Sequence, residues 1–422
     1  MELSLKKKLL LFLLLNCFYF FSYFHRVAIP GTIFNELQIN FHLTANQVAG
    51  LGTVVFYIYG LLQFFVGPCL DRFGTNRIFV GGGFLLCFGS ILFAIAHSIF
   101  LLYLSRILVG IGASVAYLGL VKKTDELFGR DFFSIMLGVA LFLGYSGGLF
   151  ATLPFERLVH QFGWRNTILV MGVILFFVMT VILSTIAKQH QFSQQKNSFS
   201  LDDIKSVILN KKIHPVLIVA AINFTIYFVF QTIIGKKLIQ DICGLSSKIA
   251  ASFTLIMMGT TMVAALLWGL VVHLIKQKKV LVIAVCLASM ISCIFMLTNL
   301  ILFKIPVVFL LCFFIFALTG GSGPLTTTLI KELGPSSGVG TAVGFVNGAC
   351  YISVAIAGNI AGLIMDRFSS KAIVTPDAII YPVPAYVTIT TVCLFLNLVS
   401  FIVSFKIRES EKEIEFEVPA PL

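Results

Sequence analysis

Residues 67–77 read Gly-Pro-Cys-Leu-Asp-Arg-Phe-Gly-Thr-Asn-Arg and form a short charged segment between two long apolar runs. The runs cover residues 46–69 and 78–97, and each is long enough to cross a bilayer core of about 30 Å as a helix. Because a charged loop is not stable in lipid, this stretch predicts two membrane-spanning helices joined by a turn at the membrane surface. The rest of the chain repeats this organisation.

The composition of the 422 residues is typical of an integral membrane protein. Hydrophobic residues make up 58% of the chain and charged residues 11%, whereas soluble chains have about 25% charged residues. Thirty Lys and Arg against eighteen Asp and Glu give a net charge of +12, but the basic residues are spread as short flanks between apolar runs. That placement is typical of charges at membrane surfaces, so we expect contact with the lipid bilayer and no nucleic-acid partner.

Twelve apolar runs have the length of a membrane-spanning helix. They cover residues 9–29, 46–69, 78–97, 99–121, 132–155, 165–187, 213–234, 248–272, 280–301, 306–330, 338–363 and 383–405. The polar segment 188–212 separates an amino-terminal half, 1–187, from a carboxy-terminal half, 213–405, and a tail follows at 406–422. The sequence therefore predicts an all-α membrane protein of two six-helix bundles joined by a linker.

The positions of the basic residues predict the orientation in the membrane. With the amino terminus inside, twenty of the thirty Lys and Arg lie in inner segments and nine in outer ones, and Arg106 lies within a span. Lys and Arg are retained on the cytoplasmic side, so both termini and the linker are expected there. The first apolar run follows Lys6–Lys8 without a small-residue cleavage site, which favours a retained span over a removed signal peptide.

Four loops resemble one another and divide the chain at regular intervals. They follow the second, fifth, eighth and eleventh spans, at residues 70–77, 158–165, 272–279 and 365–371. Asp71 and His273 lie 202 residues apart, and His160 and Asp366 lie 206 apart. This spacing predicts three-helix repeats that are inverted within each half and parallel between the halves, an organisation found in secondary transporters.

Two motifs resemble those of the major facilitator superfamily. Residues 67–77 resemble its loop motif G-x-x-x-D-R-x-G-x-x-R, and residues 106–112 resemble its second motif, R-x-x-x-G-x-G. With the twelve spans and the repeat, the resemblance covers essentially the whole chain. It implies two bundles that rock about a central cavity lined by the first, fourth, seventh and tenth spans, so that the chain carries a solute by alternating access.

The resemblance also assigns a gating role to the loop motif. It implies that a cytoplasmic latch, which favours the outward-open state, is formed by Gly67, Asp71, Arg72, Gly74 and Arg77. The residues themselves also allow a tight turn in which Gly74 supplies an unusual backbone angle.

A second resemblance concerns the end of the first span. Arg26 followed by Pro30, together with residues 50–63, is similar to the intraphagosomal nutrient transporters of intracellular proteobacteria. It implies a bacterial inner-membrane protein that handles an amino acid or a similar nutrient.

Polar side chains recur at steps of three and four residues on the helices that the resemblance places at the cavity. They are Asn16, Tyr19, Tyr23 and Arg26; Arg106, Ser114 and Tyr117; Asn223, Tyr227 and Gln231; and Thr319 and Ser322, with Asn347 and Tyr351 of the eleventh span at its border. Such steps place each set on one helix face. Polar groups facing lipid would be unsatisfied, so these faces either line a solute path or form hydrogen bonds between helices.

The two intramembrane arginines are the most informative members of this set. Arg106 lies seven residues from the start of its span at residue 99, about 10 Å below the surface. A charge placed in the membrane costs about 2.5–3.5 kcal/mol on insertion scales, so Arg106 either contacts a solute or is tied to an acid or to carbonyl groups. Arg26 lies nearer the outer end, where it either contacts a solute or extends to the interface.

Catalytic and cofactor chemistry is not indicated by the sequence. His, Asp and Glu show neither triad nor metal-ligand spacing, and nine Cys without a CxxC pair argue against a metal site. We expect no enzyme activity, no metal and no cofactor. Because no acid lies in the middle of a span, we also expect weak or indirect proton coupling, or facilitated diffusion. The candidate proton carriers are His25, Glu36, Asp71, Asp125 and Glu126.

These observations predict a secondary transporter for a small organic solute that bears a carboxylate, such as an amino acid. The sequence leaves open a siderophore, a drug or another metabolite as the solute, and it leaves open a solute sensor of the same shape. No segment requires an oligomer, so a monomer is expected.

Overall fold

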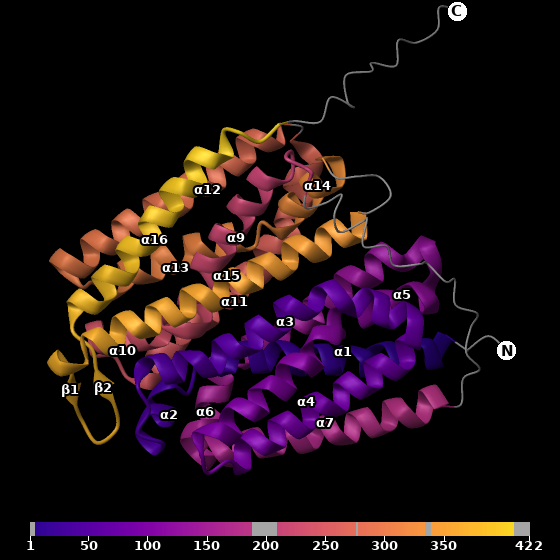
Figure 1. Ribbon diagram of the computed structural model, residues 1–422, viewed down its shortest axis with the longest axis horizontal. Coiled ribbons are helices and arrows are strands. Elements are labelled where there is room, and N and C mark those ends of the chain that lie inside the picture. Colours follow the sequence, from indigo (N-terminus) through magenta and orange to yellow (C-terminus); the bar gives the residue numbers. More distant parts are fainter. Residues whose placement is uncertain (1–4, 188–208, 276, 334–338, 409–422) are drawn as a thin grey trace, which may run out of the picture.

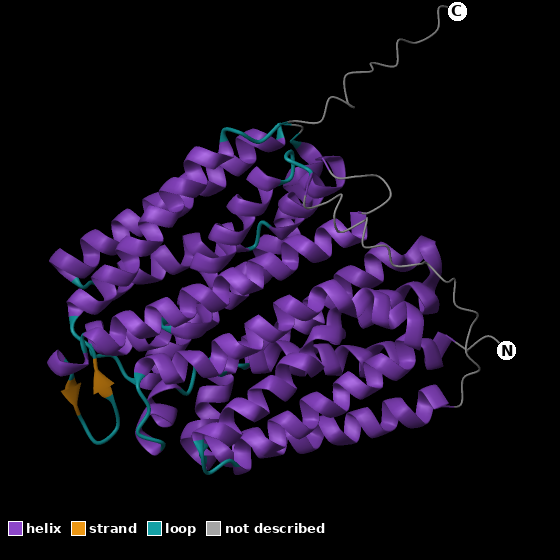
Figure 2. Ribbon diagram, viewed as in Figure 1, coloured by secondary structure: helices purple, strands orange, loops and turns teal. Residues whose placement is uncertain are grey.

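The long apolar runs of the sequence form helices in the computed structural model, which describes residues 5–187, 209–275, 277–333 and 339–408. Within these ranges, eleven helices are long and apolar enough to cross a membrane, or twelve if a bent pair counts as one span. Helices form nearly all of the described structure, and two short strands lie at one end (Figure 2). The prediction of an all-α membrane fold with transmembrane helices is confirmed.

The first half of the chain forms one bundle, at the bottom in Figure 1. Its long helices are α1 (Leu5–Ala28), α3 (Ala45–Phe73), α4 (Thr75–Ile95), α5 (Ile99–Phe150), α6 (Leu153–Phe162) and α7 (Trp164–Ala187). Gly129, with φ 66°, separates two helices within α5. The predicted span at 132–155 is therefore the second part of α5, and a bend of 42° joins it to α6.

The second half forms the other bundle, at the top in Figure 1. Its helices are α9 (His214–Phe228), α11 (Ser247–Leu274), α12 (Lys278–Thr298), α13 (Pro306–Gly320), α14 (Gly323–Leu333), α15 (Val339–Arg367) and α16 (Val383–Ser404). Two π-helical turns, Val229–Ile233 and Asn299–Phe303, extend α9 and α12. Four of these helices have Pro in their first turn, where the missing N–H has no helical partner to lose.

Five short elements lie together at one end of the molecule, which we call the hairpin end (Figure 1). They are α2 (Phe34–Asn40), α10 (Gly235–Cys243), a 3-10 turn (Ser369–Lys371) and an antiparallel pair of strands, β1 (Ile373–Val374) and β2 (Ile379–Ile380). Helix α1 begins and α16 ends at the opposite end (Figure 1), which we call the terminal end. The predicted spans did not include these short elements.

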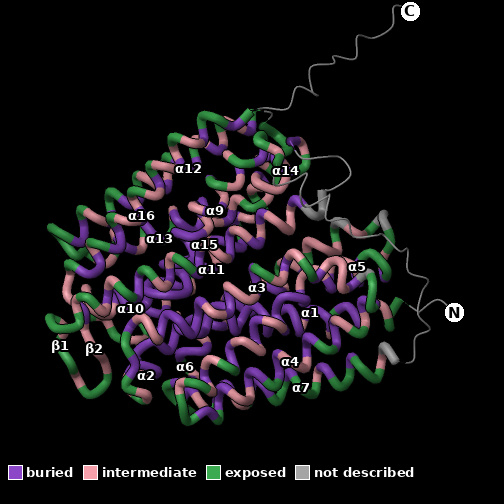
Figure 3. Tube along the Cα trace, viewed as in Figure 1, coloured by how far each residue is buried: buried purple, intermediate pink, exposed green. Residues whose placement is uncertain are grey.

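The two bundles meet chiefly along α3 and α15, which run side by side between them (Figure 1). Buried residues follow these two helices and α1 through the middle of the molecule (Figure 3). A Cβ added to Gly60 would lie 2.8 Å from the carbonyl oxygen of Gly348, and the reverse distance is the same. Small residues allow such close approach of helix backbones in membranes, so the bundles are in direct contact at mid-depth.

Two of the four related loops share one backbone feature. Gly74, with φ 91°, ends α3 and precedes α4, and Gly163, with φ 77°, ends α6 and precedes α7. Each glycine follows a Phe in its loop. Because these angles are strained for residues that carry a Cβ, the glycines let two antiparallel helices follow one another without a longer loop.

We predict that Gly163→Ala lowers the stability of the folded protein by about 1–3 kcal/mol, because Ala must adopt a strained backbone conformation there. A Cβ at Gly163 would meet no atom within 4 Å, so the effect would come from the backbone alone. Thermal unfolding in detergent measures the change.

Gly269→Ala is the matched control, because Gly269 lies within α11 and its Cβ would also meet no atom within 4 Å. Its unfolding temperature should stay unchanged or rise slightly, since Ala favours helices over Gly. Equal losses in the two variants would contradict a special role for the loop glycine.

Candidate functional site

Arg26 lies in the last turn of α1 with 2% of its surface exposed. Its Nε donates to the carbonyl oxygen of Ser22 at 3.2 Å, and its Nη1 donates to the hydroxyl of Tyr351 at 2.8 Å. Its Nη2 is buried and has no hydrogen-bond partner. Among the described residues, no carboxylate forms a salt bridge with Arg26. A buried positive charge therefore lies between the two bundles without an acidic partner.

Aromatic rings enclose this guanidinium group. The Cζ atom of Arg26 lies 4.2 Å, 4.9 Å and 5.7 Å from the ring centroids of Tyr23, Tyr59 and Tyr351. Tyr145 packs against Tyr23 with the ring centroids 4.8 Å apart. Each ring face attracts a cation with about 0.5–2 kcal/mol, which offsets part of the cost of burying the charge.

These rings belong to a larger group, which we call the tyrosine cluster. It consists of Tyr19, Tyr23, Tyr59, Tyr117, Tyr145 and Tyr351, from α1, α3, α5 and α15. The sequence-based prediction named four of the six and missed Tyr59 and Tyr145. These two lie on the second and fifth spans, outside the four helices that the resemblance placed at the cavity.

Arg106 lies within α5 and is fully buried. Its Nε donates to the carbonyl oxygen of Leu51 at 2.8 Å, and its Nη2 donates to those of His25 at 3.0 Å and Ile29 at 3.3 Å. Carbonyl groups at the carboxyl end of a helix lack intrahelical partners, and Arg106 supplies donors at the end of α1. These bonds support the interpretation, left open by the sequence, that Arg106 is held by backbone carbonyl groups. Contact between its Nη1, which has no hydrogen-bond partner, and a solute remains a prediction.

The bonds of Arg106 also determine where Arg26 lies. His25, whose carbonyl oxygen accepts from Arg106, directly precedes Arg26 in the chain. The two arginines therefore have different surroundings, although each keeps one nitrogen without a hydrogen-bond partner. Arg106 bonds to three backbone carbonyls, and Arg26 lies among tyrosine rings.

Several predicted cavity residues bond within the helix bundles instead. Asn16 donates to the carbonyl oxygen of Phe12, and the hydroxyls of Ser114, Thr319 and Ser322 donate to carbonyls one turn back. Gln231 donates to the carbonyl oxygen of Thr254. The bond of Gln231 joins two helices, as the helix-bonding alternative expects, whereas the other four bonds are local to one segment. Contact of these residues with a solute remains a prediction.

Asn223 bonds to two other helices of its own bundle. Its amide donates to the hydroxyl of Ser400 at 3.1 Å and to the sulfur of Cys286 at 3.6 Å. These partners belong to α16 and α12, so Asn223 points into its own bundle. Tyr227, one turn further along, instead donates to the sulfur of Met258 on α11 at 3.5 Å.

Two side-chain amides connect the bundles on the terminal-end side of the tyrosine cluster. Gln63 of α3 donates to the carbonyl oxygen of Ser114 at 3.1 Å, and Asn347 of α15 donates to the side-chain oxygen of Gln63 at 3.4 Å. Asn347 thus lies at the boundary between the bundles. Its contact with a solute remains a prediction.

The hairpin end is closed by contacts between the bundles. Asp366, at the end of α15, accepts from the backbone N–H groups of Ala45 at 2.7 Å and Asn46 at 3.2 Å, in the first turn of α3. A carboxylate is favourable at the amino end of a helix, because it pairs free N–H groups and meets the positive end of the helix dipole. On the same end, Gln38 of α2 donates to the hydroxyl of Tyr381 at 2.8 Å.

A buried ion pair reinforces this closure. Nζ of Lys236 in α10 lies 2.5 Å from Oε2 of Glu156 in α6, and both side chains are at most 4% exposed. The same ammonium group donates to the carbonyl oxygen of Thr32. Lys236 belongs to one bundle and both of its partners to the other.

The predicted latch motif lies at the terminal end of α3. Arg72 and Arg77 are exposed, and the guanidinium of Arg72 lies 5.5 Å from the ring centroid of Phe73. A Cβ at Gly67 would meet no atom within 4 Å. The side chain of Asp71 lies outside the described residues, so the latch remains a prediction, whereas the left-handed turn at Gly74 is observed.

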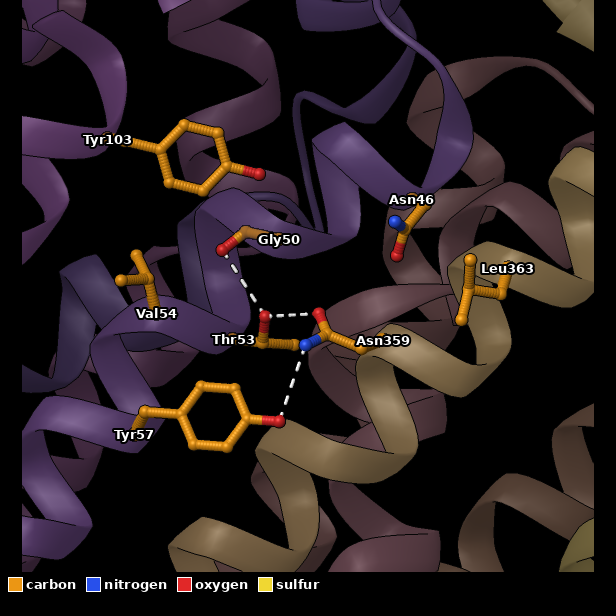
Figure 4. A pocket seen from close by; sticks show the side chains of 8 residues that line it. All are labelled: Asn46, Gly50, Thr53, Val54, Tyr57, Tyr103, Asn359 and Leu363. Atoms are coloured by element: carbon orange, nitrogen blue, oxygen red, sulfur yellow. Dashed lines mark hydrogen bonds between the residues drawn. The ribbon is translucent and has the colours of Figure 1, made fainter. Parts of the chain in front are cut away.

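A recess of about 380 Å³ lies between α3, α5 and α15 (Figure 4). Thr53 donates to the side-chain oxygen of Asn359 at 2.6 Å, and Asn359 donates to the hydroxyl of Tyr57 at 3.3 Å. None of the predicted cavity residues lines it. Its bonds join the two bundles and add to the closure of the hairpin end.

Comparison with solved structures identifies a protein of similar architecture. A crystal structure of a bacterial homologue of the human lysosomal transporter Spinster, in an inward-facing and unoccupied conformation, superimposes with a TM-score of 0.78 at 13% identity, over 96% of this chain and 97% of that one. At this identity, the likeness shows the fold alone.

Curated relatives match parts of the chain. The uncharacterized transporter YybO of Bacillus subtilis is 34% identical over 157 residues, 36% of this chain and 35% of the relative. Monocarboxylate transporter 2 of Homo sapiens is 25% identical over 164 residues, 37% and 32% of the two chains. Multidrug resistance protein 2 of Bacillus subtilis is 26% identical over 245 residues, 53% and 57%. The matches thus span about a third to just over half of these relatives.

The family assignment rests on a longer match. The model of the Major Facilitator Superfamily matches residues 11–358, which include both motifs of the sequence and the helices that carry the two arginines and the tyrosine cluster. This chain belongs to the Major Facilitator Superfamily.

Proposed function

We propose that this protein carries a small organic solute with a carboxylate group across the membrane by alternating access, and that Arg26 binds the carboxylate. The buried guanidinium group without an acidic partner is the observation that carries this proposal. A buried charge that lacks its partner is destabilised by several kcal/mol. A solute carboxylate would pair with Arg26 and accept a hydrogen bond from Nη2.

The tyrosine cluster supports a compact solute. Ring faces of Tyr23 and Tyr59 surround the guanidinium and offer apolar surface beside it, and the hydroxyl of Tyr351 already bonds to Nη1. Tyrosine combines apolar area with a polar end, which suits an amino acid or a similar monocarboxylate. The similarity to monocarboxylate transporter 2 agrees with this class.

The orientation follows from the distribution of Lys and Arg along the chain. The segments richer in these residues lie at the terminal end, which we therefore place in the cytoplasm with both termini, in the inner membrane of a bacterium. The hairpin end then faces outward, and its closure describes a state in which outer solution does not reach Arg26. A monomer provides the complete site, because both bundles belong to one chain.

The wider similarity to multidrug resistance protein 2 keeps drug or metabolite export as a competing function. Arg26 disfavours cationic drugs, because like charges at close range repel. A siderophore with several carboxylates would also pair with Arg26, and a solute sensor would bind without transport. The experiment below separates these outcomes.

We predict that counterflow in proteoliposomes identifies a carboxylate-bearing solute. Vesicles preloaded with unlabelled amino acids and monocarboxylates should accumulate the matching labelled compound. Arg26→Gln should raise the concentration for half-maximal entry about thirtyfold or more, because losing one partner of a buried charge pair costs about 2–5 kcal/mol. Arg26→Lys should retain part of the activity, because it keeps the charge but loses the planar fork.

Arg157→Ala provides the control for this experiment, because Arg157 is an exposed arginine of α6. It should leave entry unchanged. Entry of cationic drugs but of no carboxylate would overturn the proposal. Binding without entry would indicate a sensor, and entry that is insensitive to Arg26→Gln would exclude Arg26 as the anion site.

We further predict that Arg106 variants lose stability before they lose solute recognition. Arg106→Ala leaves three buried carbonyl groups without their charged donor and should lower the free energy of unfolding by about 2–4 kcal/mol. Arg106→Lys should lose less. Thermal unfolding without solute, followed by counterflow on the folded fraction, separates the two effects. A normal unfolding temperature with complete loss of entry would instead show that Arg106 contacts the solute.

A further inference from the structure

Five charged side chains gather at the hairpin end, apart from Arg26 and the tyrosine cluster. Glu36 comes from α2, Glu156 from α6, and Lys236, Lys237 and Asp241 from α10. Lys236 pairs with Glu156 at 2.5 Å, and Lys237 pairs with Asp241 at 2.6 Å with both side chains 1% exposed. We call these five residues the outer charge cluster.

Glu36 is the odd member of this cluster. Its Oε2 is shielded from solvent and has no hydrogen-bond partner, while both lysines are already paired with other carboxylates. The two pairs are neutral, so an ionised Glu36 would leave one uncompensated negative charge at a closed interface. Burial raises the pKa of the Glu36 carboxyl, and the nearby Lys236 opposes this rise only in part.

Among the described residues, the elements packed around Glu36 supply no further positive charge that would compensate an ionised Glu36 carboxylate. The charges that act on the Glu36 carboxyl are Lys236 and Lys237 of α10 and Glu156 of α6. The next residue of α6, Arg157, and the later His160 are exposed. From the end of β2, Tyr381 accepts a bond from Gln38, which lies two residues after Glu36 in α2. Helix α3 begins with Ala45, Asn46 and Gln47, which do not titrate. Burial also raises the pKa of the Asp241 carboxyl, but Asp241 pairs with Lys237. Glu36 is therefore the carboxyl of this cluster with a shielded oxygen that lacks a partner.

We propose that Glu36 is a proton-binding site of the outer gate: its carboxyl group is protonated when the hairpin end is closed and ionises when that end opens to water. This inference rests on the alternating access proposed above but not on the identity of the solute. The proton is taken from the outer solution on closing and returned to it on opening. Proton binding then controls the gate without moving a proton across the membrane.

The direction of the pH effect follows from the raised pKa of Glu36 in the closed state. Closing binds a proton, so outer acid stabilises the closed state. The stabilisation is complete below the ordinary carboxyl pKa of about 4.3 and is lost as pH rises through the higher pKa of the closed state. Between the two values, the ratio of closed to open protein changes by at most about tenfold per pH unit.

The experiment measures gate closure directly and needs no solute. Spin labels are placed at His97→Cys and Lys248→Cys, two exposed positions at the hairpin end of different bundles, in protein whose nine native cysteines are replaced. Distances are measured in proteoliposomes between about pH 4 and pH 8, with equal pH on both sides. We expect the short-distance, closed population to increase as pH falls.

Two variants test the assignment to Glu36. Glu36→Gln mimics the protonated carboxyl and should keep the closed population high at every pH. Glu156→Gln frees Lys236 to pair with an ionised Glu36, so the midpoint of the pH dependence should fall by about one unit or more. Asp377→Asn, an exposed acid of the β1–β2 turn, should leave the midpoint unchanged.

A closed population independent of pH in the unsubstituted protein would overturn the proposal. So would a pH dependence that survives in Glu36→Gln, or a midpoint that does not move in Glu156→Gln. Because no solute is present, failure of the carboxylate assignment would leave these outcomes unaffected. Conversely, loss of the pH effect with normal counterflow would remove the gate proposal alone.

Discussion

The three hydrogen bonds from Arg106 to backbone carbonyls are the interaction on which the site depends. They join α5 to the end of α1 and to α3, at a depth where lipid offers no competing partners. Because α1 ends at Ala28, its last carbonyl groups need donors from elsewhere in the protein. By providing them, Arg106 fixes the turn that carries Arg26. The hydrogen bonds of one buried arginine, Arg106, thus determine the position of the other, Arg26.

Much of the fold was predictable, because lipid imposes simple rules on sequence. Apolar length predicted the spans, and the loop at residues 67–77 predicted a tight reversal, which Gly74 provides with φ 91°. The short elements α2, α10 and the β1–β2 pair were not predicted. They lie in polar connections, and bonds between distant segments hold them, such as those from Lys237 to the carbonyl oxygen of Ile379 and from Gln38 to Tyr381.

For the site, helix periodicity predicted only which residues share one face of a helix. Steps of three and four residues placed Tyr19, Tyr23 and Arg26 on one face, and the structure brings them together. Periodicity does not say which neighbour a face meets, and Asn223 accordingly turned towards α12 and α16. Nor does it show backbone acceptors, which carry no sequence signal, so the partners of Arg106 were visible only in three dimensions.

The repeated loops connect this geometry to alternating access. Asp366 belongs to the fourth copy, Met365-Asp366-Arg367-Phe368, whose counterpart in the first copy is Leu70-Asp71-Arg72-Phe73. At the hairpin end, Asp366 pairs with the amino end of α3 in the other bundle. Since the copies are related by inversion, the same carboxylate chemistry is available at both ends of the molecule. The bonds at Asp366 must break when the hairpin end opens, and a latch at Asp71 would then hold the terminal end closed. In the proposed transport cycle, one loop used twice in opposite orientation would supply the same kind of carboxylate contact to each closed end.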